Sequence, residues 1–389
     1  MALSLPTVLI AYLLLFAVLY AGFGVQSPYL PTLLKEHGLG AEAIGIVLAA
    51  GTAIRLAAGP AAGRIADRLD AAKLVFAGCA AAAALAALGY LLATGFWALL
   101  AITLLQASAL APLAPLGDTL VLAAAAPHES RERPAFDYGW VRGAGSGAFI
   151  LGLAISGQAV DRYGLWSIVW LNASLLGVAA LLAPRLPKLP RPGPPRLAAA
   201  IADTGGISEL LRLRAFQRVI LVAALILGSH ALHDSFAMIR WQSAGIDSGT
   251  AGILWSESVA AEVVVFLLIG RPLLDRIGPN GAAVLAALAG VLRWSVEAET
   301  AWLPAVALIQ PLHGITFALL HLGCMQRLAT SVPPHIAATA LTVYGTVGIG
   351  AATALLTLAS GSLYGAIGPH GFWVMAGLCA AALPFARRL

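Results

Sequence analysis

The chain has 389 residues, of which 60% are hydrophobic and only 11% are charged, and its mean hydropathy is +0.88. A water-soluble protein of this length could not cover so much apolar side-chain surface, so the composition indicates that lipid solvates most of the chain. The net charge of +5 is small, and the three cysteines stand alone without metal-binding or redox spacing. We therefore expect a membrane protein in contact with the lipid bilayer, with no bound metal, no cofactor and no nucleic-acid partner.

Twelve apolar segments of spanning length follow one another along the chain. They form two groups of six, separated by a polar stretch rich in Pro and Arg. The predicted fold is an all-α membrane protein with an N-terminal half over 1–184, a cytoplasmic linker over 185–215 and a C-terminal half over 216–389. The segments cover 7–34, 41–63, 73–94, 96–126, 137–160, 164–184, 216–240, 249–270, 281–297, 302–329, 336–361 and 370–386.

The placement of Lys and Arg predicts the orientation of these segments, because cytoplasmic loops carry an excess of both residues. With both termini in the cytoplasm, the external side holds only Lys35, Arg162 and Arg240. Arg55, Arg142 and Arg293 fall within segments, and the remaining Lys and Arg lie on the cytoplasmic side. We expect a multi-pass protein of the bacterial inner (plasma) membrane, acting as a monomer.

Cysteine labelling tests this topology. In a background without Cys79, Cys324 and Cys379, single cysteines placed within 184–195 should react only with a reagent supplied from the inside. A cysteine at Glu36 should react only from the outside. Labelling of the linker from the outside would overturn the orientation.

A short charged turn occurs after the second segment of each half. The first copy, Gly63–Asp70, and the second copy, Gly270–Gly278, each contain an Asp-Arg pair between long apolar segments. Basic residues alone are typical of cytoplasmic turns, but a repeated acid–base pair at the same ordinal position indicates duplication. Both copies resemble the loop signature of the major facilitator superfamily, Gly-x-x-x-Asp-Arg-x-Gly followed by basic residues. The matching residues are Gly63, Asp67, Arg68 and Lys73, then Asp275, Arg276 and Gly278. Asp70 and Arg271 depart from the two glycine positions of that signature.

Two charged side chains lie inside consecutive segments of the first half, Asp118 in the fourth and Arg142 in the fifth. A charge at this depth costs roughly 2.5–3.5 kcal/mol even on insertion scales, so the pair indicates either a substrate site or a structural ion pair between helices. The surrounding residues resemble the corresponding helices of the lactose permease and phenylpropionate permease branch of the superfamily. That resemblance implies that Asp118 and Arg142 bind the substrate.

The second half contains further polar residues near mid-depth. Segments seven, eight and ten resemble the phenylpropionate permease family, around His230, between Trp255 and Phe266, and around His313. The resemblance implies a substrate-binding role for His230 and His313, and a proton-coupling role for Arg293 and His313. Where the lactose permease has its proton-carrying glutamate, this chain has Thr316. Glu262 is therefore our candidate proton carrier. Glu257 is a second candidate, but it lies about 140° away around the same helix.

No nucleotide-binding loop, metalloprotease motif or nucleophile elbow occurs in the sequence. We therefore expect a gradient-driven transporter that is not an enzyme, with two halves that alternately open a central site to each side. Proton-coupled import of an aromatic or other small carboxylic acid is the favoured function, because a guanidinium fork suits a carboxylate. Proton-coupled transport of a sugar or nucleoside is the alternative, and a polytopic membrane enzyme or a solute sensor without transport activity is less favoured.

Overall fold

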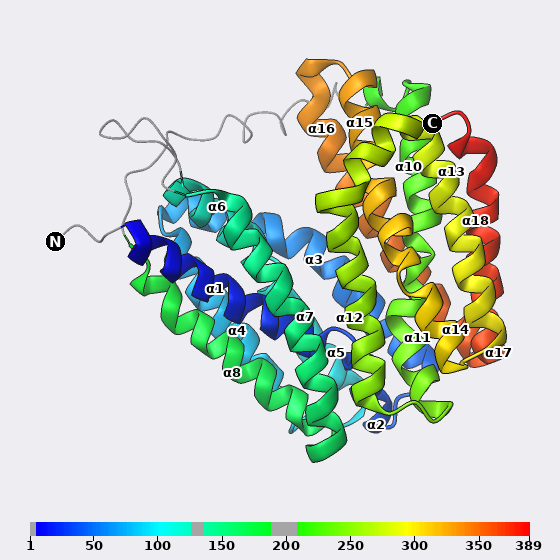
Figure 1. Ribbon diagram of the computed structural model, residues 1–389. Coiled ribbons are helices and arrows are strands. Elements are labelled where there is room, and N and C mark those ends of the chain that lie inside the picture. Colours follow the sequence, from blue (N-terminus) through cyan, green and yellow to red (C-terminus); the bar gives the residue numbers. More distant parts are fainter. Residues whose placement is uncertain (1–4, 126–135, 188–207) are drawn as a thin grey trace. The chain divides into compact units, whose positions relative to one another are not determined.

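The computed structural model describes residues 5–125, 136–187 and 208–389, and all its regular elements there are helical (Figure 1). Arg131, Arg133 and linker residues 188–207 lie outside the described residues. The helices of the first half are α1 Leu5–Gln26, α2 Leu30–Glu36, α3 Ala41–Leu69, α4 Ala72–Gly89, α5 Gly95–Leu110, α6 Leu113–Ala125, α7 Tyr138–Tyr163 and α8 Trp166–Leu182. Those of the second half are α10 Arg214–Gly228, α11 His230–Ser243, α12 Ser248–Val264, α13 Gly270–Glu299, α14 Leu303–Ile309, α15 Leu320–Ser331, α16 Ala337–Val343, α17 Ala352–Ile367 and α18 Phe372–Ala386.

Ten stretches of the described residues are long and apolar enough to cross a membrane. Two of these stretches are about twice as long as a single crossing requires, Ser248–Glu299 with 52 residues and Thr339–Ala386 with 48. Each of them accommodates two crossings, so the structure is consistent with the predicted twelve. The all-helical membrane fold is confirmed.

Two compact units make up the chain. Unit 1 comprises Met1–Leu39, Ala50–Pro194 and Ser248–Ile253, and unit 2 comprises Gly40–Ala49, Pro195–Asp247 and Leu254–Leu389. Within unit 1, the carboxylate of Asp161 near the end of α7 accepts hydrogen bonds from the amides of Ser248 and Gly249, at 2.8 and 2.6 Å. These amides belong to the first turn of α12, where backbone donors lack partners within the helix. The start of α12 is thereby fixed within unit 1.

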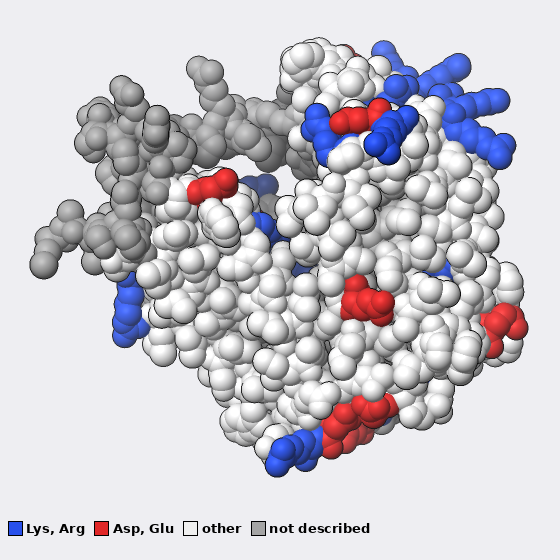
Figure 2. Space-filling view, viewed as in Figure 1, with Lys and Arg blue, Asp and Glu red and all other residues white. Residues whose placement is uncertain are grey.

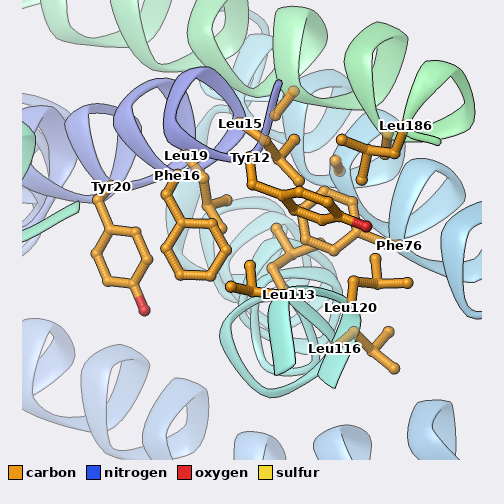
Figure 3. Close-up of a cluster of buried hydrophobic side chains, with 14 of the residues drawn as sticks. Tyr12, Leu15, Phe16, Leu19, Tyr20, Phe76, Leu113, Leu116, Leu120 and Leu186 are labelled. Atoms are coloured by element: carbon orange, nitrogen blue, oxygen red, sulfur yellow. The ribbon is translucent and has the colours of Figure 1, made fainter. Parts of the chain in front are cut away.

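The core of unit 1 is built from apolar residues of α1, α4, α6 and α8. Figure 3 shows Tyr12, Phe16, Phe76 and Leu113 packed together in this cluster, and all four side chains are buried. Tyr20 lies at the edge of the cluster, and its hydroxyl points away from the other residues (Figure 3). Tyr20 thus contributes its ring to the core and leaves its polar atom for another contact.

The outer surface of the helices is apolar to an extent that water-soluble proteins avoid. Leu92, Trp97, Leu267 and Leu308 each expose more than two thirds of their side-chain surface. Figure 2 shows broad uncharged surface over the helices, with Lys and Arg gathered at the end of unit 2 where the C-terminus lies. This distribution is what a lipid-facing surface between two polar membrane boundaries requires.

The two charged turns share a positive φ at the same position of the motif. Asp70, directly after α3, has φ 53°, and Gly278 has φ 68° at the kink inside α13. Both values lie in the left-handed region, which glycine adopts without strain and Asp tolerates better than most residues. The backbone therefore explains why the superfamily signature has a glycine at this position, and why Asp70 can replace it.

Replacing Gly278 by Ala should destabilise the protein by about 1–3 kcal/mol, because its φ of 68° and ψ of 174° define a backbone region that essentially only glycine adopts. A Cβ atom at this position would meet nothing within 4 Å, so the effect isolates backbone strain. Gly177→Ala in α8 is the matched control, since that position is equally open and has an ordinary helical φ. Thermal unfolding in detergent measures both variants. Equal melting temperatures for the two would contradict the prediction.

Candidate functional site

The acid and the arginine predicted in the first half both lie in unit 1. Asp118 on α6 is half-buried and accepts a hydrogen bond from the Tyr138 hydroxyl at 2.9 Å. Arg142 lies one helical turn after Tyr138 on α7, donates from Nη1 to the Tyr20 hydroxyl, and places its guanidinium 4.7 Å from the centre of the Tyr20 ring. Consecutive turns of α7 therefore present a hydroxyl to Asp118 and a cation to the aromatic edge of α1.

Local sequence explains how these side chains are placed. The fourth predicted segment breaks between α5 and α6 near Pro112, so α6 starts afresh shortly before Asp118. The side chain of Asp137 caps α7 by accepting from the amide of Gly139 at 2.7 Å. This cap fixes the first turn of α7, from which Tyr138 and Arg142 extend.

A second polar cluster lies in unit 2, with Arg293 of α13 at its centre. Arg293 is 0% exposed, and its guanidinium lies 4.6 Å from the Trp294 ring centre. It contacts His313 Nδ1 at 3.1 Å, His233 Nε2 at 3.4 Å and Gln310 Oε1 at 3.1 Å. A guanidinium donates hydrogen bonds and accepts none, so both ring nitrogens that face it must carry lone pairs.

These contacts determine where the neutral histidines hold their protons. Because His313 Nδ1 accepts from Arg293, its N–H is at Nε2, which lies 3.4 Å from a carboxylate oxygen of Glu262. His313 and Glu262 are 17% and 24% exposed, so this pair is the open side of the cluster. His313 therefore orients a donor toward Glu262 and cannot take a further proton at Nδ1 while Arg293 occupies that nitrogen.

The opposite side of the cluster is closed and contains Glu297, one turn after Arg293 on α13. Glu297 is 0% exposed and accepts from Gln310 Nε2 at 3.4 Å. Its carboxylate also lies 3.8 Å from Arg240 Nε and 3.9 Å from His233 Nδ1, both on α11. The cluster around Arg293 thus contains two glutamates, one partly exposed and one buried.

Irregular helices position this cluster. Ser229 separates α10 from α11 directly before His230, and Pro311 interrupts the tenth segment between Gln310 and His313. π-Helical turns follow both partners of the open pair, at Val265–Ile269 after Glu262 and at Gly314–Leu319 after His313. Such turns are frequent at functional sites.

Glycine at position 314 lets the two helices of the open pair approach closely. A Cβ atom at Gly314 would lie 2.7 Å from the carbonyl oxygen of Ala261, the residue before Glu262. No other residue type fits there without moving the backbone. The close approach is what brings His313 within reach of Glu262.

The other predicted residues of the second half take different positions. His230 is buried, and its Nε2 lies 3.0 Å from Thr316 Oγ1, while its ring meets that of His313 edge to face. Thr316, at the position of the lactose permease glutamate, therefore contacts His230. Glu257 is partly buried on α12, and within the described residues it is outside the hydrogen-bonded cluster around Arg293.

The sequence did not identify Glu297, Gln310 or Arg240 as residues of this cluster. Arg240 ends the seventh predicted segment and Glu297 ends the ninth, yet their side chains are 6% and 0% exposed. One signal was available, because Arg293 and Glu297 are four residues apart and so share a helix face. Nothing in the sequence indicated that Arg240 approaches the same carboxylate from another helix.

The residues of the charged turns make contacts of their own. Lys73 donates to the carbonyl oxygens of Leu186, at 2.8 Å, and Pro187. Arg271 and Asp275 form an exposed ion pair at 3.5 Å. Asp67, Arg68 and Arg276 are exposed, and Gly63 has open space around its Cα. These residues therefore lie at the polar ends of helices, as expected for loop residues.

Ten stretches of the described residues that are long and apolar enough to cross a membrane, with a buried charged cluster in unit 2, are typical of a polytopic membrane protein, and comparisons with known proteins specify its family and role. The sequence profile of the MFS_1 like family matches residues 9–375. The probable 3-phenylpropionic acid transporter of Escherichia coli (strain K12) is 32% identical over 364 residues, which cover 92% of this chain and 91% of that protein. The maltose permease of Geobacillus stearothermophilus is 26% identical over 352 residues, which cover 90% of this chain and 86% of that protein.

Solved structures agree with this result. A mutant form of the nucleoside transporter NupG superposes with a TM-score of 0.85 at 18% identity, covering 97% of this chain and 98% of that one. At this identity the likeness concerns the fold. The chain belongs to the MFS_1-like family of the major facilitator superfamily, which confirms the family resemblance of its sequence, and it is a transporter.

Proposed function

We propose that this transporter imports an aromatic or other small carboxylic acid, similar to 3-phenylpropionate, together with a proton. The observation that carries the proposal is the placement of Arg142 over the Tyr20 ring. A guanidinium beside an aromatic surface suits an arylalkanoate, since the carboxylate can pair with the cation and the ring can contact aromatic side chains. The partly buried ring of Phe23 lies 5.4 Å from that of Tyr20 and extends that surface, while Phe16, 0% exposed, packs behind Tyr20 at 5.5 Å.

The relatives support the same substrate class. The Escherichia coli relative is described as a probable 3-phenylpropionic acid transporter, and its match extends over nearly the whole chain. Proton coupling is assigned to unit 2, where Glu262 would gain and lose the proton. His313 directs an N–H toward Glu262, and Arg293 fixes the tautomer of His313. Substrate and proton would bind on one side of the membrane and leave on the other by alternating access.

A sugar or nucleoside is the second candidate substrate. Asp118 already accepts a hydrogen bond from the hydroxyl of Tyr138, so its carboxylate can accept one from a substrate hydroxyl as well. The names of the maltose permease and of NupG fit this alternative.

Uptake into proteoliposomes tests the proposal. With the external medium more acidic than the lumen, labelled 3-phenylpropionate should accumulate, and 3-phenylpropionamide should not compete because it lacks the carboxylate. Maltose and uridine are the comparison substrates. Accumulation of either of them without competition by 3-phenylpropionate would support the alternative and overturn the carboxylate assignment.

A further inference from the structure

Three charged side chains in unit 2 are buried to an extent that sets them apart. Of the Lys, Arg, Asp and Glu residues that the structure describes, only Arg240, Arg293 and Glu297 are classed as buried, at 6%, 0% and 0% exposure. Buried ions require compensation by an opposite charge and by hydrogen bonds. Glu297 is the acid of this buried group, and both arginines need it.

Hydrogen-bond directions show that Glu297 faces donors. Gln310 Oε1 accepts from Ser258 Oγ at 2.6 Å and from Arg293, so its amide nitrogen must point to Glu297. His233 accepts from Arg293 at Nε2, so its N–H is at Nδ1, the nitrogen nearest to Glu297. The amide of Gln310 therefore donates to this carboxylate, while the N–H of His233 and the guanidinium Nε of Arg240 lie 3.9 and 3.8 Å from it, and nearby positive charge favours the ionised form.

Arg293 contacts one histidine from each of two His–Glu pairs, and the two glutamates differ in solvent exposure. On one side, Arg293 and His313 direct an N–H to Glu262, which is 24% exposed. On the other side, Arg293 contacts His233 Nε2, so the N–H of His233 at Nδ1 faces Glu297, which is 0% exposed. Protonating Glu297 would leave two buried arginines without their buried counter-charge, whereas protonating Glu262 would not.

We propose, building on the proton coupling inferred above, that Glu297 is a permanently ionised counter-ion of Arg293 and Arg240. It is a positioning residue that holds Arg293 in place and sets the electrostatic background against which the Glu262–His313 pair binds and releases a proton. The two acids of the cluster thus have separate roles, because one is fixed in charge and the other changes charge during transport.

Neighbouring charges on every packed helix enter this balance. The titratable groups that interact electrostatically with Glu297, Arg293 or Arg240 come from α11, α13, α17 and α18, and they are His230, His233, Asp234, Arg240, Glu299, Tyr364 and Cys379. His321 interacts with Glu262. The experiment therefore compares variants that change one charge at a time with a variant that restores the balance.

The test is a pH titration of the infrared band of protonated carboxyl groups in purified protein, where the band that disappears in Glu262→Gln reports on Glu262. Removing the negative charge in Glu297→Gln favours ionised Glu262, so the midpoint should move to lower pH by about one unit, the effect of a unit charge roughly 10 Å away in a protein interior. Arg240→Gln removes a positive charge and should move the midpoint to higher pH. Combining Glu297→Gln with Arg240→Gln should return it close to the wild-type value.

Controls separate charge from structure. Glu297→Asp keeps the charge and should titrate like the wild type. If Glu297 and Arg240 were needed only for packing, Glu297→Gln and Arg240→Gln would not move the midpoint in opposite directions. Should Glu297→Gln not fold, Glu297→Asp, Arg240→Gln and the charge-balanced double variant still decide the matter. The proposal would be overturned by identical midpoints in all folded variants or by shifts in one direction only. It would also be overturned if Glu297→Gln lost a protonated-carboxyl band, or if Glu262 did not titrate.

Uptake by the wild type is measured in parallel. Its failure to respond to a pH gradient would refute proton-coupled import without changing the titration result. The charge assignments of Glu297 and Glu262 and the transport function are therefore tested independently.

Discussion

Glu262→Gln should abolish the accumulation of substrate against its gradient and leave exchange of internal for external substrate near the wild-type rate. Glutamine mimics a permanently protonated carboxyl group, so the variant can complete the exchange cycle but cannot release the proton. Its amide can still interact with His313, whose Nε2 lies 3.4 Å from the native carboxylate. Uptake driven by a pH gradient and equilibrium exchange, measured in the same vesicles, distinguish the two activities.

Glu257→Gln is the matched control, because it makes the same chemical change on the same helix, outside the cluster around Arg293. It should retain accumulation. His313→Gln should mainly weaken substrate affinity if the histidine only orients its neighbours. Accumulation by Glu262→Gln would rule this residue out as the proton carrier and shift the role to Glu257 or Asp118.

Arg142→Lys should weaken binding of 3-phenylpropionate at least tenfold, corresponding to about 1.5–3 kcal/mol for a hydrogen bond to a charged group. Lysine keeps the charge but loses both the planar fork and the stacking over Tyr20. Arg162→Lys on the same helix is the control, since Arg162 also lies near a tyrosine ring, 5.8 Å from the centre of Tyr163. Isothermal titration or a ligand-dependent thermal shift measures the affinities.

Asp118→Asn should impair binding as well, because it replaces the carboxylate that accepts a hydrogen bond from Tyr138 with a neutral amide. Combined with Arg142→Gln it should fold and still fail to regain affinity. Unchanged affinity in both Arg142→Lys and Asp118→Asn would leave these residues with a structural role only. A loss specific to sugars or nucleosides in Asp118→Asn would instead favour the alternative substrate class.

Much of the fold was predictable because membrane insertion depends on properties that a linear sequence contains. The length of an apolar segment and its scarcity of charge decide whether it can cross the hydrocarbon core, and neighbouring residues suffice to measure both. The repeated Asp-Arg turns were equally visible, although only the backbone explained the departure at Asp70, which has a positive φ as Gly278 does. Which short stretches join which unit, such as the start of α12 beside Asp161, was not predictable.

The sequence by itself determined the class of protein, the family and the presence of charged residues inside apolar segments, including Asp118, Arg142, Glu262 and Arg293. Only the tertiary structure decided their partners. Whether two side chains meet depends on the rotation and depth of separate helices, and small shifts in either change the contact completely. For this reason the sequence did not show that Arg240 lies beside Glu297, or that Arg293 orients two histidines toward two different glutamates.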